Sequence, residues 1–342
     1  MRFIGFIMNI LVTGGAGYIG SHCCVALIKA GYRVIILDNF GNSHPEVLRR
    51  IEKITGRAPI NESGDVRDRS FVEYVLDHHK CEAVIHFAGL KSVAESEKQP
   101  DLYYDCNVVG SLRLLQAMKS TGVKKMVFSS TATVYGVPKY LPYDERHPLN
   151  PVSVYGRTKL TVENMLRDFY ASDPTWAFSI LRYFNPVGAD ESGLIGEDPK
   201  GIPNNLMPII AQVASGRRDK VMIWGNDYDT EDGTGVRDYI HVSDLAEGHL
   251  RALKTLDHPG CDVINLGRGR GYSVMDVIKA FEYISNKKIK YEVGPRRPGD
   301  IGEFFANPST AFEKLHWRAE KDLEKMCADM WNFQVKNPDG YN

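Results

Sequence analysis

The sequence has no excess of charge of either sign. Its 342 residues contain 42 lysines and arginines against 43 aspartates and glutamates, a formal net charge of -1. A protein that holds a nucleic-acid backbone usually carries an excess of basic residues, which displace counterions from the phosphates. We therefore expect no nucleic acid among the partners of this protein.

The sequence also lacks a long apolar run and a disulfide framework. No stretch approaches the roughly 18 apolar residues that a membrane-spanning helix needs. Residues 1–8 are mostly apolar but lead into a predicted strand without a cleavage site, which indicates a short extension rather than a signal peptide. The six cysteines show neither CxxC nor zinc-ligand spacing, a pattern typical of buried thiols in a reducing compartment. We expect a cytoplasmic protein without membrane contact.

Strand and helix patterns alternate through the first half of the chain. Short runs rich in β-branched residues predict strands, and the segments between them show helical periodicity. This alternation indicates βαβ units, and therefore a parallel sheet with helices on both faces. The predicted strands cover 10–13, 34–38, 84–87, 126–130 and 178–183, and the predicted helices cover 19–30, 70–78, 102–119 and 155–170.

The composition changes after about Asn185, where 193–203 and 225–235 are rich in Gly, Asp and Pro, residues typical of loops. We therefore expect an α/β protein with a Rossmann-type doubly wound parallel sheet at 1–185. A smaller C-terminal α/β domain is expected at 186–342, with the chain free to cross back between the two. In that second domain the patterns predict helices at 206–214, 245–253, 273–284 and 322–333 and strands at 263–266 and 289–293.

A glycine-rich turn follows the first predicted strand and opens a helix. Gly14, Gly17 and Gly20 are spaced as GxxGxxG. Glycines let the backbone turn tightly and approach a pyrophosphate, while the helix N-terminus beyond supplies N–H donors. The spacing alone also fits an ordinary glycine-rich turn. The complete segment is Thr13-Gly14-Gly15-Ala16-Gly17-Tyr18-Ile19-Gly20.

Asp38 favours the interpretation of this turn as a dinucleotide site. It ends the second predicted strand, 18 residues after Gly20, where a carboxylate accepts hydrogen bonds from an adenosine ribose. The same charge repels the 2′-phosphate of NADP, and the following Asn39-Phe40 offers no arginine to hold one. The sequence therefore predicts NAD as the cofactor.

One of three YxxxK patterns in the chain has the context of a catalytic pair. Tyr155 and Lys159 share one face of a predicted helix. A hydroxyl cluster that ends at Thr131, Ser129-Ser130-Thr131, leaves the C-terminal end of a predicted strand 24 residues before Tyr155. Ligands bind at that edge of a parallel sheet.

The other two YxxxK patterns lack this context. Between Tyr135 and Lys139 the chain contains Gly136 and Pro138, which exclude a regular helix. The pattern that begins at Tyr283 crosses the end of a predicted helix, far in the sequence from the hydroxyl cluster. We interpret that second pattern as a solvated surface pair.

The chemistry of a Tyr and Lys pair suits removal of a proton from a sugar hydroxyl near neutral pH. The pKa of a free tyrosine is about 10, so half ionisation at pH 7 requires lowering it by about 3, which is roughly 4 kcal/mol. A neighbouring lysine and the positive nicotinamide ring both favour the phenolate. We predict Tyr155 as the base, Lys159 as the group that lowers its pKa and holds the nicotinamide ribose, and Thr131 as the hydrogen-bond partner of the reacting oxygen.

Five longer segments are more specific than any of these motifs alone. They are 86–91 (HFAGLK), 130–136 (STATVYG), 182–188 (RYFNPVG), 201–206 (GIPNNL) and 229–241 (DTEDGTGVRDYIH). Together they resemble the extended short-chain dehydrogenase/reductase family, and within it the epimerases that invert carbon 4 of UDP-hexoses. The resemblance extends from Gly14 to about Trp331.

The resemblance implies two sets of ligand contacts. Arg237 and Arg297 would offer planar forks for phosphate oxygens, although without the surrounding match each would be read as a solvated surface arginine. The implied NAD contacts are Gly14, Gly17, Tyr18, Ile19, Gly20, Asp38, Asn39, Asn42, Ser43, Asp65, Val66, Phe87, Ala88, Lys91, Asn107, Tyr155, Lys159 and Phe184. The implied contacts to the uridine diphosphate and the sugar are Thr131, Asn185, Asn205, Leu206, Met222, Trp224, Arg237, Tyr239, Arg297, Asp300 and Phe304.

The resemblance also implies the reaction. Such an enzyme interconverts UDP-galactose and UDP-glucose through a 4-keto sugar, with hydride passing from carbon 4 to NAD and back to the opposite face. NAD is therefore expected to stay bound through many turnovers. The diphosphate contacts hold the substrate while the sugar turns over.

Two residues depart from the family pattern or distinguish its members. Thr131 stands where many of these epimerases carry serine, and it retains the hydroxyl. Phe304 occupies a position that in the family separates enzymes restricted to hexoses from those that also accept N-acetyl sugars. Its bulky ring predicts weak activity on UDP-N-acetylglucosamine.

Other functions remain open at this level. A sugar-nucleotide 4,6-dehydratase shares the fold and the Tyr and Lys pair, but the resembling dehydratases carry acidic residues where this chain has Ala132 and Thr133. Another NAD-dependent enzyme that modifies sugar nucleotides, including one acting on a uronic acid, is not excluded. A non-catalytic dinucleotide sensor would need neither the base nor its lysine.

Neither the histidines nor the helices change this interpretation. The adjacent His78 and His79 lie at a predicted helix end and His86 lies on a strand, so we predict no metal site. The helices at 102–119 and 155–170 carry apolar side chains beyond those that one sheet face requires, and the family implies a homodimer through them. Simple packing of these helices on the sheet is the alternative.

Overall fold

The computed structural model describes residues 8–201, 203, 205–297 and 299–341. The short extension predicted at the N-terminus, up to residue 7, lies outside the described residues. So do Ile202 and Asn204 of the GIPNNL segment. No helix in the described part of the chain is long and apolar enough to cross a bilayer.

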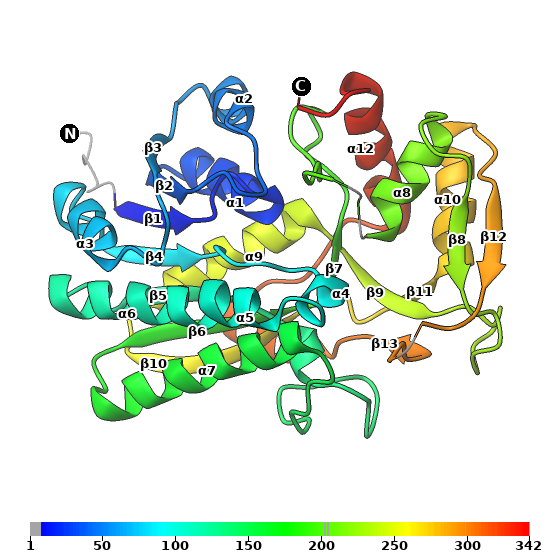
Figure 1. Ribbon diagram of the computed structural model, residues 1–342. Helices are drawn as coiled ribbons and strands as arrows, with labels where there is room; N and C mark the ends of the chain where they lie inside the picture. The colour runs from blue at the N-terminus through cyan, green and yellow to red at the C-terminus, as the bar shows by residue number, and fades with distance from the viewer. Residues whose placement is uncertain (1–7, 202, 204, 298, 342) are drawn as a thin grey trace. The chain divides into compact units, whose positions relative to one another are not determined.

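A seven-stranded sheet forms the centre of the fold, with strand order β10-β6-β5-β4-β1-β2-β3 (Figure 1). β1 lies between β2 and β4 and runs parallel to both, with Thr13 paired to Leu37 on one side and to His86 on the other. The direction in which the strands are added reverses at β1, which makes the edge between β1 and β4 the point where such sheets bind nucleotides. The strands are β1 (Asn9–Thr13), β2 (Arg33–Asp38), β3 (Ile60–Ser63), β4 (Ala83–His86), β5 (Lys125–Thr131), β6 (Ala177–Tyr183) and β10 (Gly260–Leu266).

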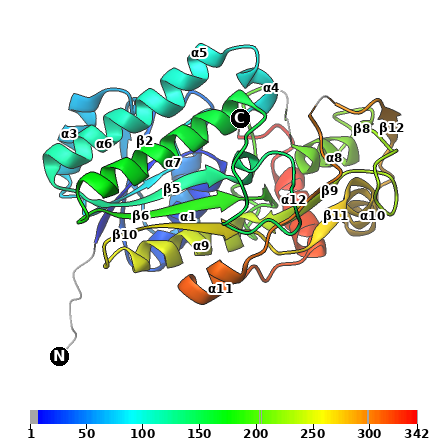
Figure 2. The same cartoon turned by 90° about the horizontal axis from the view of Figure 1, so that it is seen from below.

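Helices cover both faces of this sheet. Figure 2 shows α3, α6 and α7 on one face and α1 and α9 on the other. The first group packs on the strands through a continuous apolar cluster that includes Leu76, Leu115 and Leu166, all at most 1% exposed. The helices between the strands are α1 (Tyr18–Lys29), α2 (Glu46–Thr55), α3 (Arg69–His78), α4 (Val93–Ser96), α5 (Pro100–Tyr103), α6 (Gly110–Thr121), α7 (Val154–Ser172) and α9 (Val242–Thr255).

The predicted Rossmann-type parallel sheet is confirmed, and each of its five predicted strands is present within one residue of its expected ends. The helix predicted at 102–119 differs in one respect. Between α5 and α6 the chain forms a π-helical segment, Tyr104–Val109, which widens the helix at Asn107. Such segments often occur at functional sites and leave no mark in hydrophobic periodicity.

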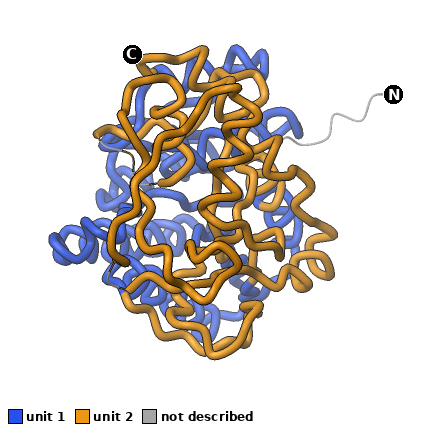
Figure 3. Tube along the Cα trace, turned by 90° about the vertical axis from the view of Figure 1, so that its right-hand side faces the viewer, with its two compact units in different colours: residues 1–130, 153–181, 249–263 blue, residues 131–152, 182–248, 264–342 orange. Residues whose placement is uncertain are grey.

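The chain divides into two compact units, shown in different colours in Figure 3. Unit 1 comprises 1–130, 153–181 and 249–263, and unit 2 comprises 131–152, 182–248 and 264–342. The chain passes between the units several times, and near residue 185 it passes from unit 1 to unit 2 between residues 181 and 182. The strand predicted at 263–266 is the end of β10, an edge strand of the central sheet whose residues from Ile264 onward belong to unit 2. The helix predicted at 245–253 contributes its second half to unit 1.

Unit 2 contains two smaller sheets. β9 (Val236–His241) is flanked by β11 (Gly271–Ser273) and β13 (Glu303–Phe304) and also pairs with β7 (Asn185–Val187). β8 (Val221–Trp224) pairs in parallel with β12 (Tyr291–Gly294). The remaining elements are the 3-10 turn η2 (Ala132–Val134) and the helices α8 (Leu206–Ala214), α10 (Val274–Ser285), α11 (Ser309–Leu315) and α12 (Leu323–Lys336).

Candidate active site

The glycine turn between β1 and α1 depends on the absence of side chains. Gly14 has a φ of +69°. A Cβ on Gly14 would lie 2.7 Å from the backbone nitrogen of Ala88, and a Cβ on Gly20 would lie 2.3 Å from the carbonyl oxygen of Gly14. Gly17 is the N-cap of α1 and has no side chain to accept from the N–H groups of the first turn, which contains Tyr18 and Ile19. An uncapped helix N-terminus beside a close-packed glycine turn suits a pyrophosphate.

Asp38 lies at the end of β2 and orders the backbone on both sides of it. Its Oδ2 accepts from the backbone N–H of Ala16 at 3.0 Å, within the glycine turn. Its Oδ1 accepts from the backbone N–H of Phe40 at 2.8 Å and from the hydroxyl of Ser43 at 2.9 Å. The carboxylate is buried, so these hydrogen bonds fix its position beside the turn.

The end of β3 approaches the end of β2 through two polar side chains. Asn39 Nδ2 donates to Asp65 Oδ2 at 3.0 Å. Arg67 pairs with the same carboxylate at 2.7 Å and, together with Asn39, holds the pKa of Asp65 at about 2. Asp65 is therefore ionised and fixed at neutral pH. Val66 directly follows Asp65, and Asn42 lies in the loop after β2.

The segment after β4 returns over the end of β1. The backbone N–H groups of Phe87 and Ala88 both donate to the carbonyl oxygen of Thr13, at 2.9 and 3.1 Å. Farther along the segment, Lys91 Nζ lies 6.0 Å from the centre of the Tyr18 ring. These contacts bring the 86–91 segment beside the glycine turn.

Asn107 holds this segment to α7. Its Oδ1 accepts from the backbone N–H of Leu90 at 2.8 Å, while its Nδ2 donates to the carbonyl oxygen of Leu90 and to the hydroxyl of Thr158, each at 3.1 Å. Both amide hydrogens of Asn107 are thus engaged within the protein. The side chain is buried, so it acts on the neighbouring loop rather than presenting a free amide.

His86 is linked to the backbone of Asn107 through the hydroxyl of Ser111. Its Nδ1 lies 2.6 Å from the Thr13 hydroxyl, and its Nε2 lies 2.9 Å from the hydroxyl of Ser111, which donates to the carbonyl oxygen of Asn107. Burial, together with the nearby charge of Lys159, lowers the pKa of His86 to about 3. The ring is therefore neutral at pH 7 and serves as a hydrogen-bonding link.

Tyr155 and Lys159 lie on the first two turns of α7. Ser153 caps the helix by accepting from the backbone N–H of Gly156 at 3.0 Å, and the backbone N–H of Tyr155 donates to the hydroxyl of Ser96. Lys159 Nζ donates to the carbonyl oxygen of Ser129 at 2.8 Å, and its side chain is 5% exposed. Burial lowers the pKa of Lys159 to about 8, which leaves the ammonium mostly charged at pH 7.

The hydroxyl cluster ends β5, as predicted. Ser130 donates to Glu163 Oε1 at 2.6 Å, and Glu163, fully buried, also pairs with Arg167 at 3.0 Å. Lys159 and Glu163 thus fix two consecutive residues of β5 from one face of α7. The next residue, Thr131, has its hydroxyl 3.0 Å from that of Thr133.

In unit 2, β9 and the strands paired with it carry four of the residues implied to contact the substrate. Asn185 on β7 pairs in register with Tyr239 on β9, and Phe304 on β13 pairs with Arg237. Arg237 donates to the carbonyl oxygen of Val236 at 2.9 Å. Burial raises the pKa of Tyr239 to about 12, so its hydroxyl stays protonated.

Phe304 belongs to an aromatic cluster. Its ring centre lies 5.2 Å from that of Phe184 and 4.8 Å from that of Tyr143. Phe184, implied as an NAD contact, therefore lies in unit 2 beside the residue implied to determine sugar specificity. The remaining implied NAD contacts lie in unit 1.

The other implied substrate residues lie on three further parts of unit 2. Asn205 is the N-cap of α8 and donates to Glu197 at 2.6 Å, and Leu206 begins the helix. Met222 and Trp224 lie on β8. Arg297 pairs with Asp300 at 3.0 Å, and its guanidinium lies 5.9 Å from the centre of the Trp224 ring.

The structure separates the YxxxK pattern of Tyr155 and Lys159 from the other two. Tyr135 ends the 3-10 turn η2 and is followed by Gly136 at a φ of +72°. Tyr283 lies near the end of α10 and is 77% exposed. Neither pattern is a helical pair at the end of a strand of the central sheet.

The histidines considered as metal ligands have other partners. His79 pairs with Glu62 at 2.6 Å, and the His78 ring stacks on Tyr74. Among the residues that the structure describes, no group of three or more His, Cys, Asp or Glu side chains is arranged to hold a metal ion.

Comparison of the sequence with models of known protein families shows the family to which the chain belongs. The model of the NAD dependent epimerase/dehydratase family matches residues 10–267. The chain belongs to this family.

Several relatives align with this chain over almost its whole length. It is 54% identical to the UDP-glucose 4-epimerase of Bacillus subtilis over 98% of this chain and 99% of the relative, and 52% identical to the human UDP-glucose 4-epimerase over 97% and 98%. The crystal structure of UDP-glucose 4-epimerase from Bifidobacterium longum in complex with NAD+ and UDP is 51% identical, with a TM-score of 0.95. That comparison covers 97% of this chain and all of the other. The resemblance found in the sequence is confirmed.

The residues of this chain around the glycine turn and Asp38 are suited to bind NAD. The glycine turn leaves room that a Cβ would fill, the first turn of α1 has no capping side chain, and Asp38 lies at the end of the adjacent strand. These are the features that accommodate a pyrophosphate and an adenosine ribose.

Sequence reasoning missed several residues that order this site. Glu163 would be expected on the solvated face of its helix, yet it is buried against Ser130. Ser153 carries a sequence signal that could have been read, because a serine directly before a helical pattern is a common N-cap. Glu197, which accepts from Asn205, carries no such signal.

Proposed function

We propose that this protein interconverts UDP-galactose and UDP-glucose by inverting carbon 4. The observation that carries the proposal is the placement of Tyr155 and Lys159 about one turn apart at the start of α7, where Lys159 is buried, mostly charged at pH 7 and donates to the carbonyl oxygen of Ser129 near the end of β5. Relatives named UDP-glucose 4-epimerase at 52 to 54% identity support the substrate assignment. The site residues and their roles are part of the proposal.

The chain's own residues would divide the work as follows. Tyr155 removes the proton of the 4-hydroxyl as hydride leaves carbon 4, and returns it in the second half of the reaction. Lys159 favours the phenolate of Tyr155 through its charge. Thr131 hydrogen-bonds the oxygen on carbon 4. NAD, when bound, supplies the acceptor and donor of the hydride.

The substrate's diphosphate would be held by unit 2. Arg237 and Arg297 bring two planar cations, and Asn185 and Asn205 bring amides on the edges of their elements. Because these groups bind a part of the substrate that does not react, the sugar is free to turn over while the nucleotide stays bound. The sugar can be repositioned between the two half-reactions because the groups that bind the diphosphate do not bind the sugar.

A 4,6-dehydratase is the less favoured alternative. Loss of water needs a further acid and base next to the hydroxyl cluster, and this chain has Ala132 and Thr133 in the 3-10 turn that follows Thr131. The Thr133 hydroxyl lies 3.0 Å from that of Thr131, and a threonine hydroxyl does not ionise near neutral pH.

A homodimer and a cytoplasmic location complete the proposal. Tyr104 and Val109 on the π-helical segment before α6 are 40% and 36% exposed, which supports an apolar contact between copies on this side of unit 1. Sedimentation of the purified protein at the mass of a single chain would contradict the dimer.

NMR of the purified protein with UDP-galactose tests the proposed function. With no cofactor added, we expect the anomeric signal of UDP-glucose to appear and to stop at an equilibrium mixture. Added NAD separates loss of cofactor from lack of activity. Continued absence of UDP-glucose with folded, NAD-supplemented protein would contradict the function.

Phe304 predicts which sugars are accepted. Its ring fills space beside Phe184 and Tyr143, so we expect wild-type activity on UDP-N-acetylglucosamine to be at least about tenfold below that on UDP-glucose. Phe304→Ala should raise kcat/KM for the N-acetyl sugar by removing the ring, with a smaller change for UDP-glucose. Phe312→Ala, at an exposed site on α11, is the control. Efficient turnover of the N-acetyl sugar by wild type would show that Phe304 does not restrict the pocket.

A further inference from the structure

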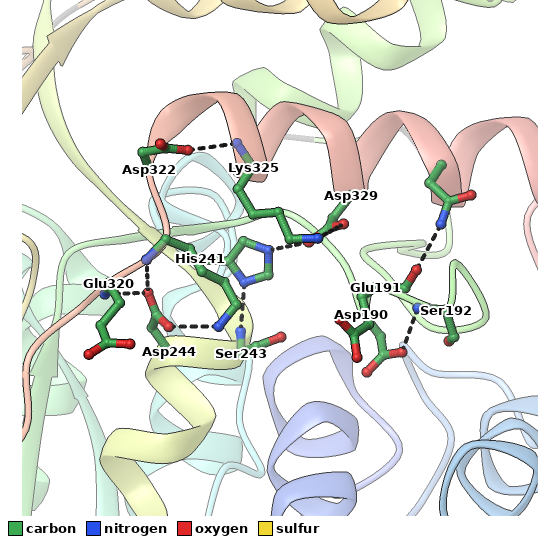
Figure 4. Close-up of polar contacts among 12 residues, drawn as sticks. Asp190, Glu191, Ser192, His241, Ser243, Asp244, Glu320, Asp322, Lys325 and Asp329 are labelled. Carbon is green, nitrogen blue, oxygen red and sulfur yellow. Dashed lines mark hydrogen bonds and ion pairs between the residues drawn. The ribbon is translucent and has the colours of Figure 1, made fainter.

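The C-terminal helix α12 binds the first part of the segment between β7 and α8. Asn332 on α12 donates to the carbonyl oxygen of Glu191 at 2.9 Å, and Lys336 donates to the carbonyl oxygen of Ser192 at 2.8 Å. Figure 4 shows Glu191 and Ser192 gathered beside α12. These side chains bind main-chain oxygens, so they fix the path of the segment whatever its side chains are.

Tyr341 continues this contact beyond the end of α12 and binds the backbone of Gly196 and the side chain of Asp198, the residues on either side of Glu197. Its hydroxyl accepts from the backbone N–H of Gly196 at 2.9 Å and donates to the carbonyl oxygen of Gly196 at 3.0 Å. Its own backbone N–H donates to Asp198 Oδ2 at 2.8 Å. Tyr341 is buried against Phe333, with ring centres 5.7 Å apart. Tyr341 therefore helps to hold the two neighbours of Glu197 in place.

Glu197 in turn fixes the side chain of Asn205. The carboxylate is 7% exposed, and its Oε1 accepts from Asn205 Nδ2 at 2.6 Å. Asn205 is the N-cap of α8, yet its side chain makes no cap hydrogen bond to the helix. Pro208, the third residue of α8, has no N–H to offer such a bond. The amide is thus drawn away from capping the helix and held by the carboxylate.

We infer that Glu197 is a positioning residue that sets the amide of Asn205 for the substrate's diphosphate. A carboxylate only accepts hydrogen bonds, so it selects the N–H end of the amide and excludes the flipped orientation. The second hydrogen on Nδ2 is then directed away from Glu197, and the first turn of α8 is left without a side-chain cap. The second Nδ2 hydrogen and the backbone N–H groups of that first turn are donors from which phosphate oxygens accept hydrogen bonds. The inference rests on the proposed function, since it assigns a role within the same substrate site.

The test compares Glu197→Ala with Glu197→Gln. Loss of a hydrogen bond to a charged acceptor should raise KM for UDP-galactose and the Kd for UDP by roughly tenfold in Glu197→Ala, with kcat within about twofold of wild type. Glu197→Gln keeps a carbonyl oxygen that accepts from Asn205, so it should restore KM to within about threefold. Glu191→Ala, which removes an exposed carboxylate from the same segment, is the matched control and should leave both constants unchanged. Equal losses of kcat and affinity, or no rescue by glutamine, would overturn the inference.

A double-mutant cycle with Asn205→Ala identifies the path of the effect. If Glu197 acts through Asn205, the UDP affinity of the double variant should equal that of Asn205→Ala alone. Additive losses would overturn the inference. Tyr341→Phe removes only the hydroxyl that binds Gly196 and leaves Glu197 itself in place. It should also raise the Kd for UDP, as Glu197→Ala does. UDP affinity is measured by calorimetry independently of turnover, so an inactive wild type that binds UDP would count against the proposed function and leave this comparison intact.

Discussion

Tyr155→Phe should lower kcat for UDP-galactose by roughly a thousandfold. The substitution keeps the ring and removes the only group on α7 proposed to take the proton from the 4-hydroxyl, and positioned general bases contribute factors of about 100 to 10,000. Because the hydroxyl is not part of the backbone contacts that hold the start of α7, NAD content and the melting temperature should stay close to wild type. Turnover is measured by coupled assay or by NMR, with NAD content measured after protein denaturation.

Tyr283→Phe is the matched control for this experiment. It alters a tyrosine in another YxxxK pattern, on a 77% exposed side chain far along the chain from the hydroxyl cluster. We expect its kcat to equal that of wild type. A Tyr155→Phe variant that retains more than about a tenth of wild-type activity would remove Tyr155 from the role of base.

Lys159→Met should lower kcat at pH 7 by at least about a hundredfold and move the acidic limb of the rate profile to higher pH. The methionine keeps most of the length of the side chain but loses the charge that we propose favours the phenolate of Tyr155. Without that charge the pKa of Tyr155 rises toward that of free tyrosine, and each unit of increase reduces the ionised fraction at pH 7 about tenfold. Activity should therefore recover partly between pH 8 and 10.

The measurement is kcat and kcat/KM from pH 6 to 10 for the variant and for Lys124→Met. Lys124 forms a half-exposed ion pair with Asp173 at 2.8 Å, away from the candidate site, and its replacement should leave the profile unchanged. A Lys159→Met variant with reduced activity and an unshifted profile would show that Lys159 holds ligand or structure without influencing the base.

The parts of the site that follow a strand could be predicted from the sequence. Asp38 and Thr131 each end a run of β-branched or apolar residues, and a parallel sheet brings such ends to one edge. The glycine spacing before α1 similarly has a local physical cause, because Gly14 and Gly20 meet backbone atoms at distances that no Cβ allows. Periodicity and local sterics act over a few residues, and a sequence displays them directly.

The parts that depend on contacts between distant segments could not be predicted. Nothing in the residues of β10 indicates that it pairs beside β6, so the sequence does not predict that this strand extends the central sheet. Asn107 is buried because the π-helical segment turns it toward Leu90 and Thr158, whereas its sequence neighbours indicate an ordinary helix. Glu163 is a polar residue whose partner, Ser130, lies 33 positions away. Each of these features becomes visible only when the two segments are placed together.

Return of the same hydrogen to carbon 4 is the most direct test of the proposed reaction. UDP-galactose carrying deuterium at carbon 4 is incubated with the purified protein in ordinary water, and the UDP-glucose formed is examined by NMR and mass spectrometry. Transfer away from carbon 4 and back within one site predicts that the product keeps its deuterium at carbon 4. Product with solvent hydrogen at that carbon would contradict the hydride mechanism and indicate inversion by proton exchange instead.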